Sequence, residues 1–342
     1  MRLSARYVLS AVIVALSATC VRAQTAKEWE DVIAAAKKEG QVVVYTAYLS
    51  KNTNDPIARA FEKKYGIQVN YLAARGSEIR ERVRAEQAAG RYLGDVLHHA
   101  LATTSTWAVE EKAIQPNGGL PNAAKLKASL KRWASDPYQT PIFTINYGFL
   151  VNTRLVKPED EPRRWTDVLD PKWKGKIIAD DPRASGGGAV MFRLTYDKFG
   201  REFHEKLAAQ SPVFGRDYSV SARRVAQGEF PLYLPYILSD YSNVRGLPVK
   251  YIVPEEGVTY GSYAAPILKN APHPNAARLL ADFYLSDEVQ TIYAKEGHGI
   301  VIDGIQEKMP ASVEAVMNAK PLAPEDFKRI DEMYDLAKQI YK

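Results

Sequence analysis

The first part of the chain alternates between stretches of helical periodicity and short apolar runs. Apolar residues recur at helical spacing from Trp29 to Ala36, and Gly40 is expected to end that helix. The run 42–45 is rich in valine, as in a buried parallel strand. Further helices are expected at about 56–65, beginning at Pro56, and at about 77–89, capped by Ser77; strands are expected at 67–71 and 95–97. This order of elements predicts an α/β fold.

The second part of the chain contains longer strands and a helix-rich end. Strands are expected at 142–151, 176–178, 232–234, 249–253 and 260–268, and helices at 189–199, 202–209, 220–227, 275–285, 288–296 and 324–341. No stretch has the composition of a long flexible linker. Because 342 residues exceed what one core usually serves, we expect two lobes joined by short crossing segments at 144–152 and 257–264. Lobe one would contain 24–143 and 260–342, and lobe two 144–259.

The N-terminus has the three parts of a secretory signal. Arg2 and Arg6 precede an apolar run, and the small-residue site Val21-Arg22-Ala23 follows it. We expect cleavage after residue 23 and a periplasmic mature chain. The formal charge of +6 then falls to +3, since residues 1–23 hold three Arg and no acid, and the single Cys is lost. Neither a nucleic-acid-binding footprint nor a thiolate site remains in the mature chain.

A glycine-rich turn between a strand and a helix is the strongest chemical signal. Residues 181–188 read Asp-Pro-Arg-Ala-Ser-Gly-Gly-Gly, and the amides of Ser185, Gly186 and Gly187 would bind an anion, with Arg183 adding charge. The alternative is a plain turn with Ser185 as the helix cap. Arg75, Gly76 and Ser77 repeat this pattern in lobe one, where a solvated Arg beside a cap is the alternative.

Tyrosine and histidine supply further candidates near strand ends. Strands ending near Tyr45 and Leu97 feed loops, and ligands in open α/β sheets bind beyond such ends. Adjacent strand residues point to opposite faces, so one of His98 and His99 would face a crevice; the alternative is a chance pair on a strand edge. Tyrosine suits a small-ligand cleft, although packing is the alternative for each one. The sequence contains no G-x-S-x-G, P-loop or H-E-x-x-H motif, so we expect no enzyme.

Two stretches resemble the periplasmic solute-binding proteins of ABC importers, in the ferric-iron-type branch of the two-lobed type II class. They are residues 165–177, WTDVLDPKWKGKI, and residues 273–283, HPNAARLLADF. The resemblance implies two α/β lobes with a ligand cleft between them, and an anion site at Ser185-Gly186-Gly187. Ferric binders of this branch carry adjacent tyrosines after a lobe-two strand. Here residues 232–237 read Leu-Tyr-Leu-Pro-Tyr-Ile, without an adjacent pair.

The sequence therefore predicts a monomeric receptor that binds a small phosphorylated or carboxylated solute and delivers it to an ABC permease and ATPase complex, with no cofactor. The expected ligand-binding residues are Thr46, Tyr48, Arg75, Gly76, Ser77, His99, Arg183, Ser185, Gly186, Gly187, Tyr236 and Tyr260. The alternative is ferric iron held by Tyr233, Tyr236 or Tyr241 together with an anion.

Overall fold

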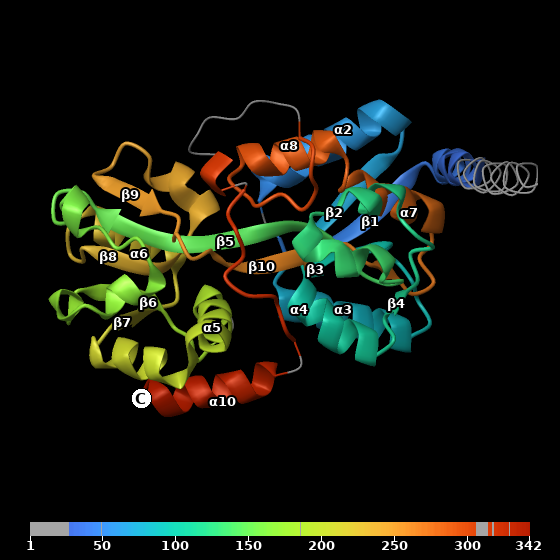
Figure 1. Cartoon of the computed structure of the whole chain (residues 1–342). Helices are drawn as coiled ribbons and strands as arrows, with labels where there is room; N and C mark the ends of the chain where they lie inside the picture. The colour runs from blue at the N-terminus through green and yellow to red at the C-terminus, as the bar shows by residue number, and fades with distance from the viewer. Residues whose placement is uncertain (1–26, 49, 185, 306–313, 317, 328) are drawn as a thin grey trace, which may run out of the picture.

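A computed structural model describes residues 27–48, 50–184, 186–305, 314–316, 318–327 and 329–342. Two groups of helices and strands lie at opposite ends of one long sheet (Figure 1). The predicted α/β architecture with two lobes is confirmed. No helix in the described ranges has both the length and the apolar character needed to cross a membrane. The expected signal at 1–23 lies outside these ranges.

Lobe one is built on the parallel strands β2-β1-β3. Its elements are a helix at 27–39, β1 Gln41–Thr46, α2 Lys51–Tyr65, β2 Gln68–Ala73, α3 Gly76–Ala88, β3 Val96–Ala100, α4 Leu101–Thr103, the helical turns Thr104–Ala108, Pro121–Lys125 and Ala128–Ser135, β4 Ile114–Gln115, β11 Ile267–Leu268, α7 Pro274–Phe283 and α8 Asp287–Lys295. Two expected boundaries are wrong. Helix α2 begins five residues before Pro56, which lies inside it. Arg75, not Ser77, is the cap of α3.

Lobe two surrounds the outer half of β5 Pro141–Asn152. Its elements are the helical turns Pro158–Asp160, Trp165–Leu169, Pro171–Trp173 and Leu238–Val244, β6 Ile177–Asp180, α5 Gly187–Ala209, β7 Val213–Gly215, α6 Tyr218–Ala226, β8 Leu232–Ile237 and β9 Val249–Ile252. The two helices expected at 189–199 and 202–209 form α5, which is interrupted at Gly200 with φ 76°. A side chain at this positive φ would be strained, so glycine suits the break.

Strands β5 and β10 (Thr259–Ala264) join the two lobes. The sheet order is β2-β1-β3-β10-β5-β8-β6-β7. The first half of β5 pairs antiparallel with β10, and its second half pairs with β8 and β9. Figure 1 shows β5 extending from one lobe into the other. Both expected crossing segments therefore lie in continuous strands of one sheet, not in flexible loops.

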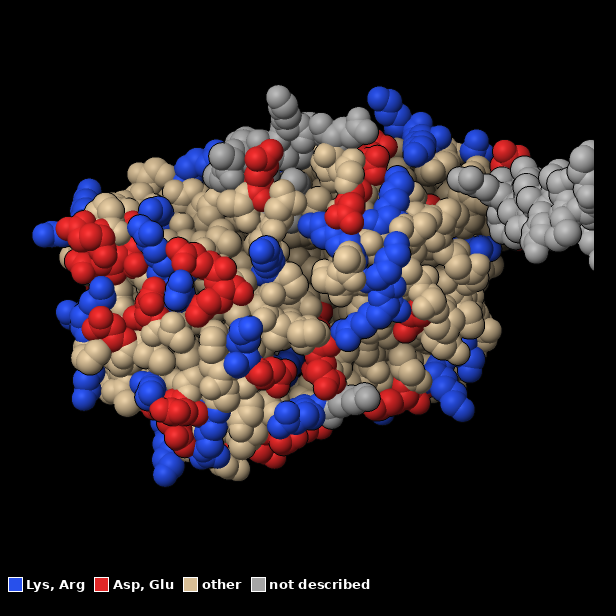
Figure 2. All heavy atoms as spheres, viewed as in Figure 1, with Lys and Arg blue, Asp and Glu red and all other residues tan. Residues whose placement is uncertain are grey.

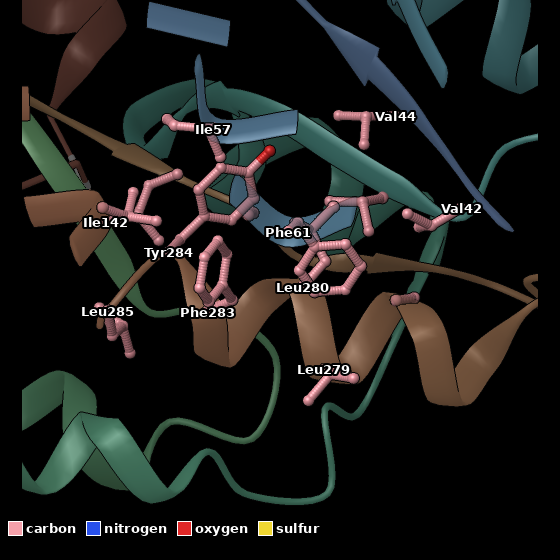
Figure 3. Close-up of a cluster of buried hydrophobic side chains, with 14 of the residues drawn as sticks. Val42, Val44, Ile57, Phe61, Ile142, Leu279, Leu280, Phe283, Tyr284 and Leu285 are labelled. Carbon is pink, nitrogen blue, oxygen red and sulfur yellow. The ribbon is translucent and has the colours of Figure 1, made fainter. Parts of the chain in front are cut away.

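Separate hydrophobic cores lie in the two lobes. The core of lobe one, part of which is shown in Figure 3, combines residues 36–143 with residues 265–302; among them are Val44, Phe61 and Phe283. The largest core of lobe two combines residues 149–234 with the chain end, including Met333, Ala337 and Tyr341. Helix α10 Ile330–Ile340 thus packs against α5 of lobe two. The expectation that all of 260–342 joins lobe one is not met by this helix.

The expected helix at 324–341 also begins later than predicted. Residues 318–327, which we call the C-terminal strap, approach the crossing strands before α10 begins. The Glu325 amide donates to the Tyr260 hydroxyl at 3.2 Å, and Arg132 donates to the Glu325 carbonyl at 2.7 Å. These backbone groups are bonded to distant residues, so the strap cannot also use them for helical bonds.

Basic and acidic side chains are interspersed over both lobes on the face shown in Figure 2. Ion pairs on the protein surface include Arg224 with Glu229 and Arg201 with Glu205. Such exposed pairs contribute little stability. Charge relevant to function is therefore better sought in side chains that the fold buries.

Candidate functional site

A cleft of about 1560 Å³ lies between the lobes. Gly76, Ser77 and His99 of lobe one line it, as do Tyr147, Gly186 and Arg193 of lobe two, residues 261–263 of β10, and the end of the C-terminal strap. Four predicted residues are therefore brought together around one space: Gly76, Ser77, His99 and Gly186. A cleft of this size can hold a small organic molecule.

His99 is a buried imidazole with unused polar atoms on the lobe-one wall. Its neighbour His98 points into the lobe-one core and bonds Thr46, as the alternation of a strand requires. His99 is only 6% exposed, and neither ring nitrogen makes a hydrogen bond of good geometry within the described residues, although the backbone of Gly76 and Ala100 lies beside the ring and partly offsets the effect of burial on its pKa. A methyl group at position 76 would lie 2.5 Å from Nε2, so only glycine lets the ring lie against the start of α3. Unpartnered buried polar groups are rare, and a bound ligand would satisfy these.

The protonation of His99 can be tested. Burial lowers the pKa of His99 from 6.5 to about 4, so we expect a neutral ring at physiological pH. Below pH 6.5 the unfolded chain binds a proton that the folded protein does not, down to about pH 4. Over this window the wild type should lose about 1.4 kcal/mol of unfolding free energy per pH unit relative to His99→Gln. Urea unfolding at a series of pH values measures this difference; equal pH slopes would contradict it.

Arg193 supplies a buried positive charge from lobe two. It is 9% exposed, lines the cleft, and has neither an ion pair nor a hydrogen bond within the described residues. Arg193 was not predicted. The signal was available, because Gly186, Ala189 and Arg193 recur at helical spacing and all line the cleft. The carboxylates of Glu325 and Asp197 interact with its charge at longer range but form no ion pair with it, so an anionic ligand would be its direct partner.

The C-terminal strap adds a buried carboxylate near Arg193. Glu325 is 5% exposed, and both carboxylate oxygens accept from the Ser262 amide at 3.3 Å, while the Ser262 hydroxyl has no partner. Burial raises the pKa of Glu325, and the charges of Arg193 and Arg132 lower it. Asp326 lines the cleft beside Glu325, so charges of both signs meet at this wall.

The glycine turn before α5 is already bonded within the protein. The Gly188 amide donates to Asp180 Oδ2 at 2.5 Å, and the Gly187 amide donates to the Tyr218 hydroxyl at 2.8 Å. Arg183, expected to add charge to an anion site, instead donates to Asp181 at 2.8 Å. Only Gly186 of this predicted group lines the cleft. Ser185 lies outside the described residues.

The sequence profile of the bacterial extracellular solute-binding proteins matches residues 106–332. The match covers more than half of the chain. This protein belongs to that family. Two relatives match over a larger part of the chain. An uncharacterized protein of Haemophilus influenzae is 26% identical, and the alignment covers 78% of this chain and 79% of that protein. A Salmonella typhimurium protein named "Putative 2-aminoethylphosphonate-binding periplasmic protein" is 24% identical over 77% of this chain and 80% of its own.

Solved structures agree on the fold of this solute-binding protein. AfuA of Actinobacillus pleuropneumoniae, with fructose-6-phosphate bound, superposes with a TM-score of 0.66 and 23% identity, over 88% of this chain and 96% of its own. Iron-bound HitA of Pseudomonas aeruginosa superposes with a TM-score of 0.71 and 19% identity, over 88% of this chain and 99% of the HitA chain. At these identities the likeness establishes the two-lobed fold and leaves the ligand to be argued from the cleft.

Other predicted residues of the solute-binding protein lie outside the cleft lining. Thr46 is fully buried and bonds the backbone of Tyr48 and the ring of His98. The Tyr48 hydroxyl lies 2.6 Å from His298 Nε2, within the lobe-one core. Arg75 is exposed at the start of α3 and is absent from the lining. None of the three predicted residues Thr46, Tyr48 and Arg75 lines the cleft in this structure.

Tyr260, predicted to bind the solute, and the tyrosines considered for iron are also absent from the cleft lining. Tyr260 lines a separate small cavity of about 50 Å³. Tyr233 and Tyr236 pack edge to face at 5.8 Å in a lobe-two core, and the Tyr236 hydroxyl has no partner. Tyr241 packs on Tyr251. Burial raises the pKa of Tyr233 and Tyr236, which opposes the phenolate form that ferric iron requires.

Proposed function

We propose that this protein is a periplasmic receptor that captures a small anionic organic solute, phosphorylated or carboxylated, and delivers it to an ABC permease and its ATPase. The observation that carries the proposal is Arg193, a buried guanidinium that faces the cleft and makes no hydrogen bond or ion pair within the described residues. The names of the Salmonella relative and of the AfuA structure, a phosphonate and a sugar phosphate, are consistent with this class of solute.

The geometry suggests how binding would be coupled to transport. His99 belongs to lobe one and Arg193 to lobe two, so a ligand contacting both would stabilise an arrangement with the lobes close together. The permease would recognise that arrangement. The proposal needs no catalytic step and no cofactor, and the receptor would act as a monomer.

A thermal-shift panel tests the proposal. It contains 2-aminoethylphosphonate, fructose 6-phosphate, citrate, ferric citrate and neutral sugars. We expect one anionic organic compound to raise Tm by several degrees, because a ligand at 100 times its Kd adds about 2.7 kcal/mol to unfolding. Stabilisation by a neutral sugar alone would contradict the proposal. Visible absorbance after loading with ferric citrate would instead support iron held by tyrosinate.

A further inference from the structure

The start of α5 is occupied by the protein's own acceptors. The first three helical amides, those of residues 187–189, have no acceptor within the helix. Asp180 accepts from Gly188 and the Tyr218 hydroxyl accepts from Gly187. An anionic ligand at this place would find these amide donors already used. It would also lie against the buried carboxylate of Asp180, which is 6% exposed. Arg183 cannot offset that charge, because it is paired with Asp181.

The start of α3, on the opposite wall, is different. Helix α3 has thirteen residues, and its first two, Gly76 and Ser77, line the cleft. Among the described residues, the carboxylate bonded there is that of Glu78, which accepts from the Arg75 amide at 3.3 Å and is exposed to water. His99 lies against Gly76, is more than nine-tenths buried, and has both ring nitrogens unpartnered. Amide donors, a helix dipole and an unsatisfied imidazole thus converge at one place.

We propose that the anionic group of the solute binds at the start of α3, on the amides of Gly76 and Ser77 and the ring of His99, and that Asp180 excludes it from the start of α5. This inference rests on the proposed function and specifies the orientation of the solute. The end of the solute that meets the start of α5 would then be neutral or cationic. Arg193 contributes its charge to the anionic end from lobe two.

Glycine amides report on both helix starts, which makes a direct experiment possible. The chain has 21 Gly, including Gly76, Gly187 and Gly188, so glycine-selective 15N labelling gives a sparse NMR spectrum. Inorganic phosphate is titrated into the full-length mature protein. We expect the Gly76 signal to move saturably while the Gly187 and Gly188 signals stay in place. Movement of Gly187 and Gly188 without Gly76, or no movement at high phosphate, would overturn the proposal.

Two isosteric variants test the role of Asp180. Asp180→Asn keeps an acceptor for the Gly188 amide but removes the charge, so phosphate should now also shift Gly187 and Gly188. Glu202→Gln removes the same charge from the exposed second part of α5, where Glu202 pairs with Lys206, and should behave like the wild type at these amides. If Asp180→Asn leaves them unmoved, Asp180 is not the excluding group. Because phosphate alone is the probe, failure here is distinguishable from failure of the organic-solute panel.

Discussion

Replacing Arg193 by methionine is expected to weaken binding of the anion that most stabilises the wild type in the panel by about 30-fold to several thousand-fold. Methionine keeps much of the side chain's bulk within α5 but removes the only guanidinium that faces the cleft from this helix. Losing one partner of a buried, hydrogen-bonded charge pair costs about 2–5 kcal/mol, and each 1.4 kcal/mol corresponds to a factor of ten in Kd. Isothermal titration calorimetry measures the change.

The matched control is Arg201→Met on the same helix. Arg201 is 48% exposed and pairs with Glu205 one turn along, so its loss changes net charge equally without touching the cleft. We expect its affinity to stay close to that of the wild type. Equal weakening in both variants would show a long-range effect of net charge. Wild-type affinity in Arg193→Met would remove the central support for the proposed function.

Replacing Trp165 by alanine is expected to lower the free energy of unfolding by about 3–5 kcal/mol, the usual cost of removing a fully buried tryptophan. Trp165 is 0% exposed and packs edge to face on Phe149 of β5. Its indole donates to the Gly257 carbonyl at 2.8 Å, just before β10 begins. The side chain therefore joins lobe two to both crossing strands. Urea unfolding followed by far-UV circular dichroism measures the loss.

Trp165→Phe separates packing from hydrogen bonding. Phenylalanine keeps an aromatic ring beside Phe149 but leaves the Gly257 carbonyl without its donor. We expect a smaller loss, about 1–3 kcal/mol, which is typical of one buried group left unsatisfied. If Trp165→Ala is no less stable than Trp165→Phe, the indole does not hold this junction by packing.

The fold was largely predictable because its periodicities are local. Residues 42–45 and 142–151 correspond to β1 and β5, and the interruption expected near residue 200 is the break at Gly200. The C-terminal strap was missed for a physical reason. The sequence of this segment has helical periodicity. The backbone of Glu325, however, is hydrogen-bonded to Tyr260 and Arg132, which are distant in sequence, and the strap therefore does not join α10. Tertiary contacts of this kind leave no local pattern.

The candidate site was predictable where a residue lies near the carboxyl end of a strand or just beyond it. Gly76, Ser77, His99 and Gly186 share that feature, and all line the cleft. Tyr48 and Tyr236 share it as well, yet lie elsewhere, because the bond of Tyr48 to His298 joins positions 250 residues apart. Likewise, the occupation of the α5 start by Asp180 and Tyr218 depends on distances that the sequence does not reveal.

The composition of the lobe-one core bears on how the chain is made. That core takes residues from 36–143 and from 265–302, so a nascent chain that ends before residue 265 lacks one side of it. Lobe one cannot complete its fold until most of the protein has been synthesised, although its first strands emerge early. Until residues 265–302 are available, the segment 36–143 is therefore expected to stay incompletely folded.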